Sequence, residues 1–423
     1  MTSDQDARSQ AIARFGTDEP GPEERKLEAG GLEVTLVGGV ARWIVYRGAE
    51  VVRGIDYLVR DGNWGTLATR TTSEEFSEVD GFRYRRRFDV GDAFQGAFEL
   101  VGNAGTPAKL DAKLTLTAVR DVSVNRAGFV LLHPLKGVVG APLDVTHSDG
   151  SQERASFPRA ISPGQPVFDI AGLSHSMDGA KVEIAFAGDV FEMEDQRNWS
   201  DASFKTYCRP LGLPRPFVVT KGDVIEQQIT VRVSGAGAAA AARGGADGIG
   251  TAPAISLALD DEIAVPDERT VAALSSIAYG GVSVRLSAGT ARGALGTAKA
   301  FNVPIDLEVV VPDGDDLRDA LASVGRICAG DGVVPRRVMA LPAPYMASIQ
   351  PEGPWPSPTP GDAAEAARNA FPSARIGGGV LTNFTELNRC RPNYDSDFVT
   401  FGNTAIVHAA DDASVLETLE AIP

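Results

Sequence analysis

Apolar and polar residues alternate in short runs along the first half of the chain, and Gly, Asp and Asn interrupt these runs. Such a run has the period of a strand that buries one face. Strands spaced in this way over about 200 residues predict a large antiparallel β-sandwich over residues 28–233. The clearest runs are residues 32–37, 41–46, 82–88, 98–101, 112–119 and 229–233.

The pattern changes after residue 250. Apolar runs, which we interpret as strands, alternate there with segments that have helical spacing, at residues 268–278, 315–327, 362–371 and 414–421. Strands that alternate with helices indicate βα units and a parallel sheet, so residues 251–423 are predicted to form a partial (β/α) barrel. The six predicted strands are residues 255–260, 282–287, 305–310, 338–341, 376–381 and 405–408.

Two segments flank these predicted domains. Residues 1–27 are charged, contain Pro and show no period, which predicts a disordered arm. Residues 234–250 are rich in Gly and Ala and are predicted to be a linker. The predicted boundaries are therefore 1–27, 28–233, 234–250 and 251–423.

The composition narrows the classes of partner. A net charge of −16 over 423 residues argues against binding to nucleic acid, and no run of about 18 apolar residues suggests a membrane span. The polar N-terminus does not resemble a signal peptide, and three distant cysteines, Cys208, Cys328 and Cys390, fit reduced thiols. We expect a soluble cytoplasmic protein.

Known signatures of cofactor and metal sites are missing from the sequence. It contains no His-x-His, no His-Glu-x-x-His and no cysteine cluster, so no metal site is expected. It also has no Gly-x-Ser-x-Gly elbow and no phosphate-binding Gly-Lys-Ser/Thr loop. We therefore expect no cofactor.

Residues 191–207 concentrate charge among aromatic side chains. Because buried charges are costly unless they are paired, this segment is either a solvated loop with surface ion pairs or a site that binds a polar ligand. Aromatic rings beside donors and acceptors suit a sugar-sized ligand, and we expect several of these polar residues to form one hydrogen-bonded cluster. The substrate-binding candidates are Glu192, Asp195, Arg197, Asn198, Asp201, Lys205 and Tyr207.

Residues 191–207 resemble the signature of the D-apionate lactonase family, bacterial enzymes that open the lactone of a branched-chain sugar acid. Residues 128–135, 145–150 and 157–158 resemble the same family, as do residues 381–389 and 406–412. The resemblance runs from about residue 30 to the end and implies a sandwich similar to the supersandwich of mutarotase-like enzymes, followed by a (β/α)₈ barrel. The family has further sequence after the point that corresponds to residue 423. We therefore expect a C-terminally truncated barrel of six strands, whereas eight close one.

In a parallel barrel, reactive groups lie at the carboxyl ends of the strands. Asp260 and Asp261 follow the first predicted strand, while Arg285 and Glu308 point to the same side of the next two. Arg285 and Glu308 are either a structural ion pair or part of the site, with Glu308 as a catalytic candidate.

The residues after the fifth predicted strand are stronger candidates, because three glycines at residues 377–379 allow close approach of the backbone. Glu386 is the candidate general base, and Asn388 and Arg389 are candidate donors to an oxyanion or a hydroxyl group. Asn383 is a further substrate-binding candidate, although it or Thr385 could instead cap a helix.

His408 ends the sixth predicted strand, three residues before Asp411. We expect His408, oriented by Asp411, to act as the acid that protonates the leaving alkoxide. A structural role is expected for His133 and His147.

The resemblance implies that the chain hydrolyses a D-apionolactone-like lactone to the free aldonate in carbohydrate catabolism. Two alternatives remain, a glycoside hydrolase-like enzyme and an inactive truncated homologue that binds sugars. The expected partner is a small sugar lactone, and a homo-oligomer is left open.

Overall fold

A computed structural model describes residues 2–19, 21–238, 253–260, 266–277, 279–347 and 355–422. The chain divides into two compact units. The first comprises Met1–Gly244 together with Ala405–Pro423, and the second comprises Gly245–Thr404. The second unit is therefore inserted, in sequence, between two parts of the first.

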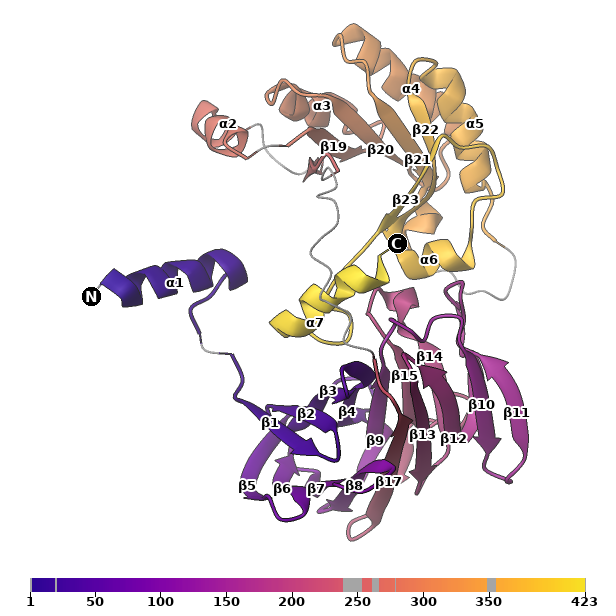
Figure 1. Cartoon of the computed structure of the whole chain (residues 1–423). Coiled ribbons are helices and arrows are strands. Elements are labelled where there is room, and N and C mark those ends of the chain that lie inside the picture. The colour runs from indigo at the N-terminus through magenta and orange to yellow at the C-terminus, as the bar shows by residue number, and fades with distance from the viewer. Residues whose placement is uncertain are drawn as a thin grey trace. The chain divides into compact units, whose positions relative to one another are not determined.

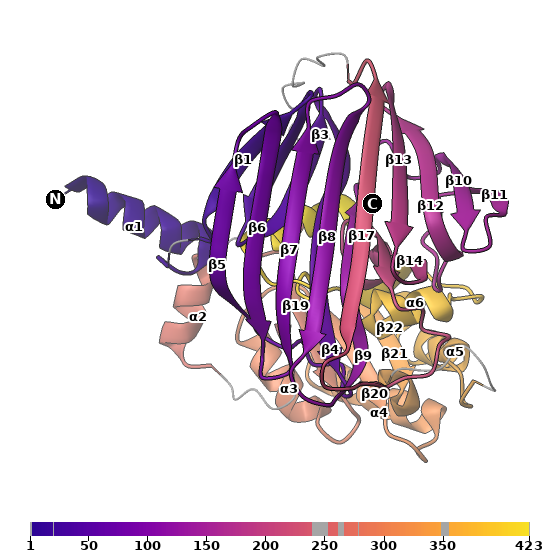
Figure 2. The same cartoon turned by 90° about the horizontal axis from the view of Figure 1, so that it is seen from below.

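The first unit is an antiparallel β-sandwich, as the alternation predicted. Figure 2 shows one layer of it, in which β5, β6, β7, β8, β17, β13, β12 and β10 lie side by side. The other layer runs β1-β2-β3-β4-β9-β15-β14, and pairing of β14 with β12 joins the two. The strands are β1 (Glu24–Ala29), β2 (Leu32–Val37), β3 (Val40–Tyr46), β4 (Ala49–Asp61), β5 (Thr69–Ser77), β6 (Gly81–Val90), β7 (Phe94–Asn103), β8 (Ala108–Ala118), β9 (Val122–His133), β10 (Pro142–His147), β11 (Gln152–Ser156), β12 (Val167–Met177), β13 (Ala180–Ala187), β14 (Phe191–Asp195), β15 (Phe204–Cys208), β16 (Phe217–Val219) and β17 (Val224–Gly235).

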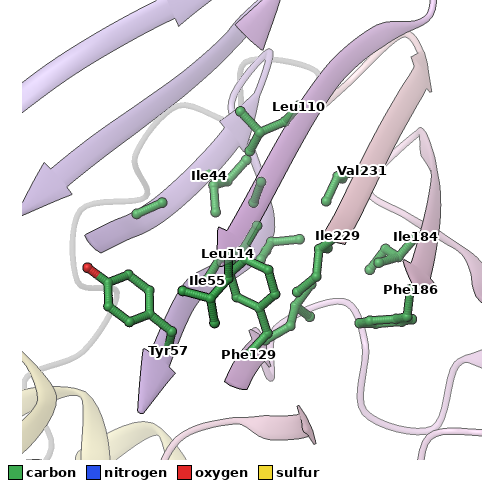
Figure 3. Close-up of a cluster of buried hydrophobic side chains, with 14 of the residues drawn as sticks. Ile44, Ile55, Tyr57, Leu110, Leu114, Phe129, Ile184, Phe186, Ile229 and Val231 are labelled. Atoms are coloured by element: carbon green, nitrogen blue, oxygen red, sulfur yellow. The ribbon is translucent and has the colours of Figure 1, made fainter. Parts of the chain in front are cut away.

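The core of this unit lies between the two layers. In Figure 3, Ile55 and Phe129 of one layer point toward Leu114 and Ile229 of the other. Strand β8 shows the expected alternation of buried and less buried residues, because only one of its faces meets the core. Strand β9 is buried at nearly every position, which indicates that both of its faces are covered.

The N-terminal segment differs from the prediction of a disordered arm over residues 1–27. Residues Thr2–Phe15 form a helix, α1, and β1 begins at Glu24 and pairs with β2. Leu27 and Ala29 on β1 are buried in the core, so apolar burial fixes a strand that the charged composition had hidden.

The second unit is a curled parallel sheet, which confirms the predicted fold class of an incomplete barrel (Figure 1). Helices α3, α4 and α5 pack against its strands and bury its main apolar core. The strands run in chain order and are β18 (Ser256–Leu259), β19 (Gly281–Leu286), β20 (Ile305–Val311), β21 (Arg337–Pro342), β22 (Arg375–Asn383) and β23 (Phe398–Gly402). The helices are α2 (Glu268–Ser275), α3 (Ala291–Lys299), α4 (Leu317–Gly330), η2 (Ala343–Met346), α5 (Pro360–Ala370) and α6 (Phe384–Arg389).

The prediction of a sixth strand at residues 405–408 was wrong. The sixth strand is β23, whose Phe398 ring packs so closely on Gly377 that a Cβ there would come within 2.6 Å of the ring. Residues 405–408 contain no strand, and they precede α7 (Asp412–Glu417) and η3 (Thr418–Ala421), which belong to the first unit.

The predicted linker lies mostly outside the described residues, since 239–250 are not described and Ser234 and Gly235 end β17. No helix in the described ranges combines the length and the apolar character needed to cross a membrane.

Candidate active site

The first unit contains a pocket of about 540 Å³. Its walls come from β3, β4, β9, β14 and β15, from η1 (Gln196–Trp199), and from residues of the C-terminal segment between Val407 and Glu417. All of these elements belong to one unit. The pocket lies on the face of the β4–β9–β15 layer that is turned away from the core.

Strand alternation explains which side chains reach this pocket. On β4, Ile55 and Tyr57 point into the core, whereas Asp56 and Arg60 line the pocket. On β15, Phe204 belongs to the core, while Lys205 and Tyr207 line the pocket.

The expected cluster of residues 191–207 forms in part around Glu194. Its Oε2 lies 2.5 Å from Lys205 Nζ, and its Oε1 accepts a 2.9 Å hydrogen bond from the indole N–H of Trp199. Burial raises the pKa of the Glu194 carboxyl, but the Lys205 ammonium and the Trp199 indole outweigh burial and leave the pKa below its usual value. Burial lowers the pKa of Lys205, and Glu194 offsets this only in part. The group is therefore a buried ion pair at the pocket wall.

Tyr207 and Glu192 form the second part of the cluster. The Tyr207 hydroxyl donates a 2.5 Å hydrogen bond to Glu192 Oε1, which also accepts from the backbone N–H of Leu211 at 2.7 Å. Burial and the two neighbouring carboxylates raise the pKa of Tyr207 far above its usual value, so the phenol stays neutral. Tyr207 is thus held in one orientation in the pocket wall, with the Arg126 guanidinium over its ring.

Asp195 and Arg197 do not line the pocket. They form a buried bidentate ion pair, with Arg197 Nε and Nη2 at 2.9 and 2.7 Å from the Asp195 carboxylate. Arg197 also donates to the carbonyl of Pro158 at 2.7 Å, and the backbone N–H of Ser162 donates to Asp195 at 2.9 Å. This pair therefore ties η1 to residues 158–162.

His408 enters the pocket and faces Asp201. Its Nδ1 lies 2.5 Å from Asp201 Oδ2, and its ring meets the Trp199 ring edge to face at 6.2 Å. An ionised carboxylate can only accept, so Nδ1 carries the proton and donates to Asp201. This bond leaves Nε2 of a neutral His408 able to accept a proton.

The prediction that Asp411 orients His408 was wrong. Asp411 instead caps α7 by accepting from the backbone N–H of Ser414 at 3.0 Å, and it lies 3.3 Å from Arg42 Nη1. An Asp directly before a helix is a favourable N-cap, and this accounts for its position.

Pocket residues that the sequence analysis did not single out include Asp56, Arg60 and Arg126. Burial raises the pKa of Asp56, although the Tyr57 N–H at 2.6 Å and nearby Arg42 and Arg86 partly offset this. The polar residues that interrupt the apolar positions of β4, among them Arg53, Asp56 and Arg60, are the sequence signal for this wall.

The remaining candidates lie in the second unit, and two of them form an ion pair across neighbouring strands. Arg285 on β19 and Glu308 on β20 face each other, with Arg285 Nη2 at 2.8 Å from Glu308 Oε2. Glu308 also accepts from the Ser283 hydroxyl at 3.3 Å. Asp260 follows β18, and Asp261 lies outside the described residues.

Asn383, Glu386, Asn388 and Arg389 lie at the end of β22 and in α6. Asn383 occupies the position before the helix but makes no side-chain capping bond. Arg389 Nη1 lies 3.3 Å from Glu386 Oε1, and Asn388 accepts from Arg391 at 2.5 Å. The predicted candidates are thus divided between the two units, and His408 belongs with Asp201 and Lys205.

Within the described ranges, no group of three or more His, Cys, Asp or Glu side chains is placed to hold a metal ion.

Comparison with known protein families gives a match for each of the two predicted domains. Residues 12–236 match the family described as D-apionate lactonase, N-terminal domain, and residues 255–423 match its TIM barrel domain. A D-apionate lactonase of Brucella anthropi is 36% identical over 431 residues, which covers 97% of this chain and 71% of that protein.

Solved structures give weaker matches. The GH36 α-galactosidase AgaB of Geobacillus stearothermophilus matches with a TM-score of 0.36 and 9% identity, over 90% of this chain and 75% of that chain. An α-N-acetylgalactosaminidase of Bifidobacterium bifidum matches with a TM-score of 0.28 and 10% identity, over 85% and 79%. Likeness at this level carries no information on activity.

Proposed function

This chain belongs to the D-apionate lactonase family, and we propose that it hydrolyses a D-apionolactone-like sugar lactone to the free aldonate in carbohydrate catabolism. We further propose that the pocket of the first unit binds the sugar ring. The observation that carries this proposal is the Asp201–His408 pair in a pocket that also holds Trp199, Glu194 and Lys205.

The pocket suits a polyhydroxylated ring. The Trp199 ring offers an apolar surface to C–H groups, and the Glu194–Lys205 pair offers an acceptor and a donor to hydroxyl groups. A volume of about 540 Å³ lies within the range that is usual for small-molecule sites.

Lactone hydrolysis needs an activated water and a proton for the leaving alkoxide. In the proposed mechanism His408 Nε2 removes a proton from water as the water attacks the lactone carbonyl. The imidazolium formed is stabilised by Asp201, and it then donates the same proton to the ring oxygen as the C–O bond breaks. One histidine thus serves as base and then as acid.

Glu386 remains the second candidate for the general base. It lies in the helix after β22, beside Arg389, at the carboxyl end of a parallel strand, where barrel enzymes carry their reactive groups. Glu308, already paired with Arg285, is the third candidate.

Rate measurements on purified variants separate these candidates. Acid release from a panel of aldonolactones, corrected for spontaneous hydrolysis, would be followed for the wild type, His408→Asn and Glu386→Gln. Loss of a general base should lower the rate by about 10²–10⁴. His147→Asn is the matched control, since His147 pairs with half-exposed Glu153 and does not line the pocket.

We expect His408→Asn to lose turnover while the control retains it. Normal turnover in His408→Asn with loss in Glu386→Gln would move the chemistry to the second unit. Cleavage of p-nitrophenyl glycosides without lactone hydrolysis would favour the glycoside hydrolase alternative. Sugar binding without turnover of any substrate would favour the inactive homologue.

A further inference from the structure

Arg126 is a buried cation that lines the pocket without an anionic partner. Its exposed fraction is 7%, and among the residues that the structure describes it forms no ion pair and no hydrogen bond. Its guanidinium carbon lies 3.8 Å from the centroid of the Tyr207 ring and 5.7 Å from that of Trp64. A buried cation is costly unless something pairs with it, so this position calls for a ligand.

A β-bulge lies directly before Arg126 in β9. Val124 pairs with Asp61 and Arg126 pairs with Arg60, so Asn125 is an extra residue in β9. In a regular strand Val124 and Arg126 would share a face, and Val124 belongs to the core. Arg126 continues the alternation of Val130 and Leu132, which also line the pocket, whereas Val124 beyond the bulge is turned into the core.

Arg60, opposite Arg126, adds a second cation that no carboxylate pairs within the described residues. Within the described ranges its guanidinium makes one hydrogen bond, of 3.2 Å, to the carbonyl of Trp64. Burial and the neighbouring Arg126 charge lower the pKa of Arg60, and the charge of Asp61, which forms no ion pair with it, offsets this only in part. By contrast, the other pocket cations have carboxylate partners: Arg42 with Glu417, Arg53 with Glu50 and Lys205 with Glu194. Uncompensated positive charge is therefore concentrated at Arg60 and Arg126.

We propose that Arg126, assisted by Arg60, forms a subsite for the carboxylate of a polyhydroxy acid. A guanidinium fork matches the two oxygens of a carboxylate, and stacking on Tyr207 fixes the plane of the fork. The subsite deepens the proposed function and rests on it for one consequence. Ring opening converts a neutral ester carbonyl into a carboxylate, so the aldonate product should bind more tightly than its lactone and inhibit turnover.

Binding to the full chain tests the subsite without any need for turnover. The probes are D-erythronate, its neutral amide and erythritol, titrated by calorimetry and by the fluorescence of Trp64 and Trp199. Charge-assisted hydrogen bonds are the strong ones, so erythronate should bind on the order of 10-fold to 100-fold more tightly than the amide or erythritol. Arg126→Met should abolish this preference, and Arg126→Lys, which keeps a point charge, should retain part of it.

Arg120→Met is the matched control, because Arg120 is exposed and, in the part of the chain that is described, pairs with Asp92 and with a backbone carbonyl, both outside the pocket. Equal affinity of the wild type for the three probes would overturn the proposal even if Arg126→Met failed to fold. A preference for erythronate that persists in folded Arg126→Met would also overturn the proposal. Displacement of erythronate by acetate and phosphate at equal concentrations would do the same. Lactone turnover without carboxylate preference would refute only the subsite, and Arg126-dependent binding without turnover would refute only the proposed reaction.

Discussion

Arg197→Ala should destabilise the first unit by about 3–4 kcal/mol. The substitution removes two hydrogen bonds to Asp195 and the bonds to the carbonyls of Pro158 and Arg159. It also removes the guanidinium from the Phe204 ring, whose centroid lies 4.8 Å away. The Asp195 side chain is fully buried, so its charge would lose its cation in a site closed to water.

The size of this loss of stability follows from the hydrogen bonds that Asp195 keeps. Breaking a buried ion pair by removing one partner costs about 3–5 kcal/mol. Asp195 keeps two backbone donors, Ser162 at 2.9 Å and residue 197 itself at 3.3 Å, and these place the expected cost in the lower part of that range. At about 2–4 °C per kcal/mol for a unit of this size, the melting temperature should fall by about 10 °C.

Urea unfolding followed by tryptophan fluorescence measures this cost, since Trp199 is two residues away and three of the four tryptophans lie in the first unit. Arg154→Ala is the matched control, because its pair with Asp144 is exposed and should change stability by less than about 0.5 kcal/mol. A double-mutant cycle with Asp195→Asn isolates the coupling between the two side chains. A cost below about 1 kcal/mol, together with unchanged turnover, would mean that the Asp195–Arg197 pair matters for neither stability nor activity.

Two further predictions concern the core of the first unit. Burial lowers the pKa of His175 to about 4 and that of His133 well below its usual value, so both are neutral when folded but take up protons on unfolding below about pH 6.5. The free energy of unfolding should therefore fall by about 1.4 kcal/mol per pH unit for each histidine as the pH drops from about 6 to 5. In urea unfolding at several pH values, His175→Phe should halve this slope. Gly128→Ala should lower the free energy of unfolding by about 2–6 kcal/mol, because Gly128 has a φ of 141° and a Cβ would come within 2.2 Å of Gln227 Oε1. Gly91→Ala, with open space around it, should lower it by only about 1–2 kcal/mol. Equal melting temperatures of the two variants would refute this reasoning.

Local pattern was enough to predict most strands. Strands of the sandwich such as β8 bury alternate residues, and β18 to β22 lie where the apolar runs placed them. The strand prediction failed at residues 405–408 because four apolar or half-apolar residues fit a strand and a loop equally well. The C-terminal segment is instead tied to the first unit through Glu417, which accepts hydrogen bonds from Arg42 and Trp43, more than three hundred residues earlier in the chain.

The candidate site was harder to predict than the fold. Lys205 and Tyr207 were found because they stand in a dense local segment, and His408 because histidines are rare in this chain. The carboxylate that orients His408 is 207 positions away in sequence, and no periodicity connects the two. Arg126 could not be recognised as a pocket residue, because β9 is buried on both faces and a single-residue bulge interrupts its alternation between Val124 and Arg126.

The position of residues 405–422 changes what a functional fragment of this protein must contain. Arg42 binds Glu417, and Arg53 binds Glu420 at 2.9 Å, so buried cations of the sandwich depend on carboxylates from the C-terminal segment. Burial opposes the charge of Arg53, but Glu50, Glu417 and Glu420 outweigh it and raise its pKa. A fragment that ended at residue 233 would therefore leave these cations short of partners and would lack His408 altogether. The sandwich and its pocket are built from both ends of the chain, and under the proposed mechanism they cannot work as the N-terminal domain alone.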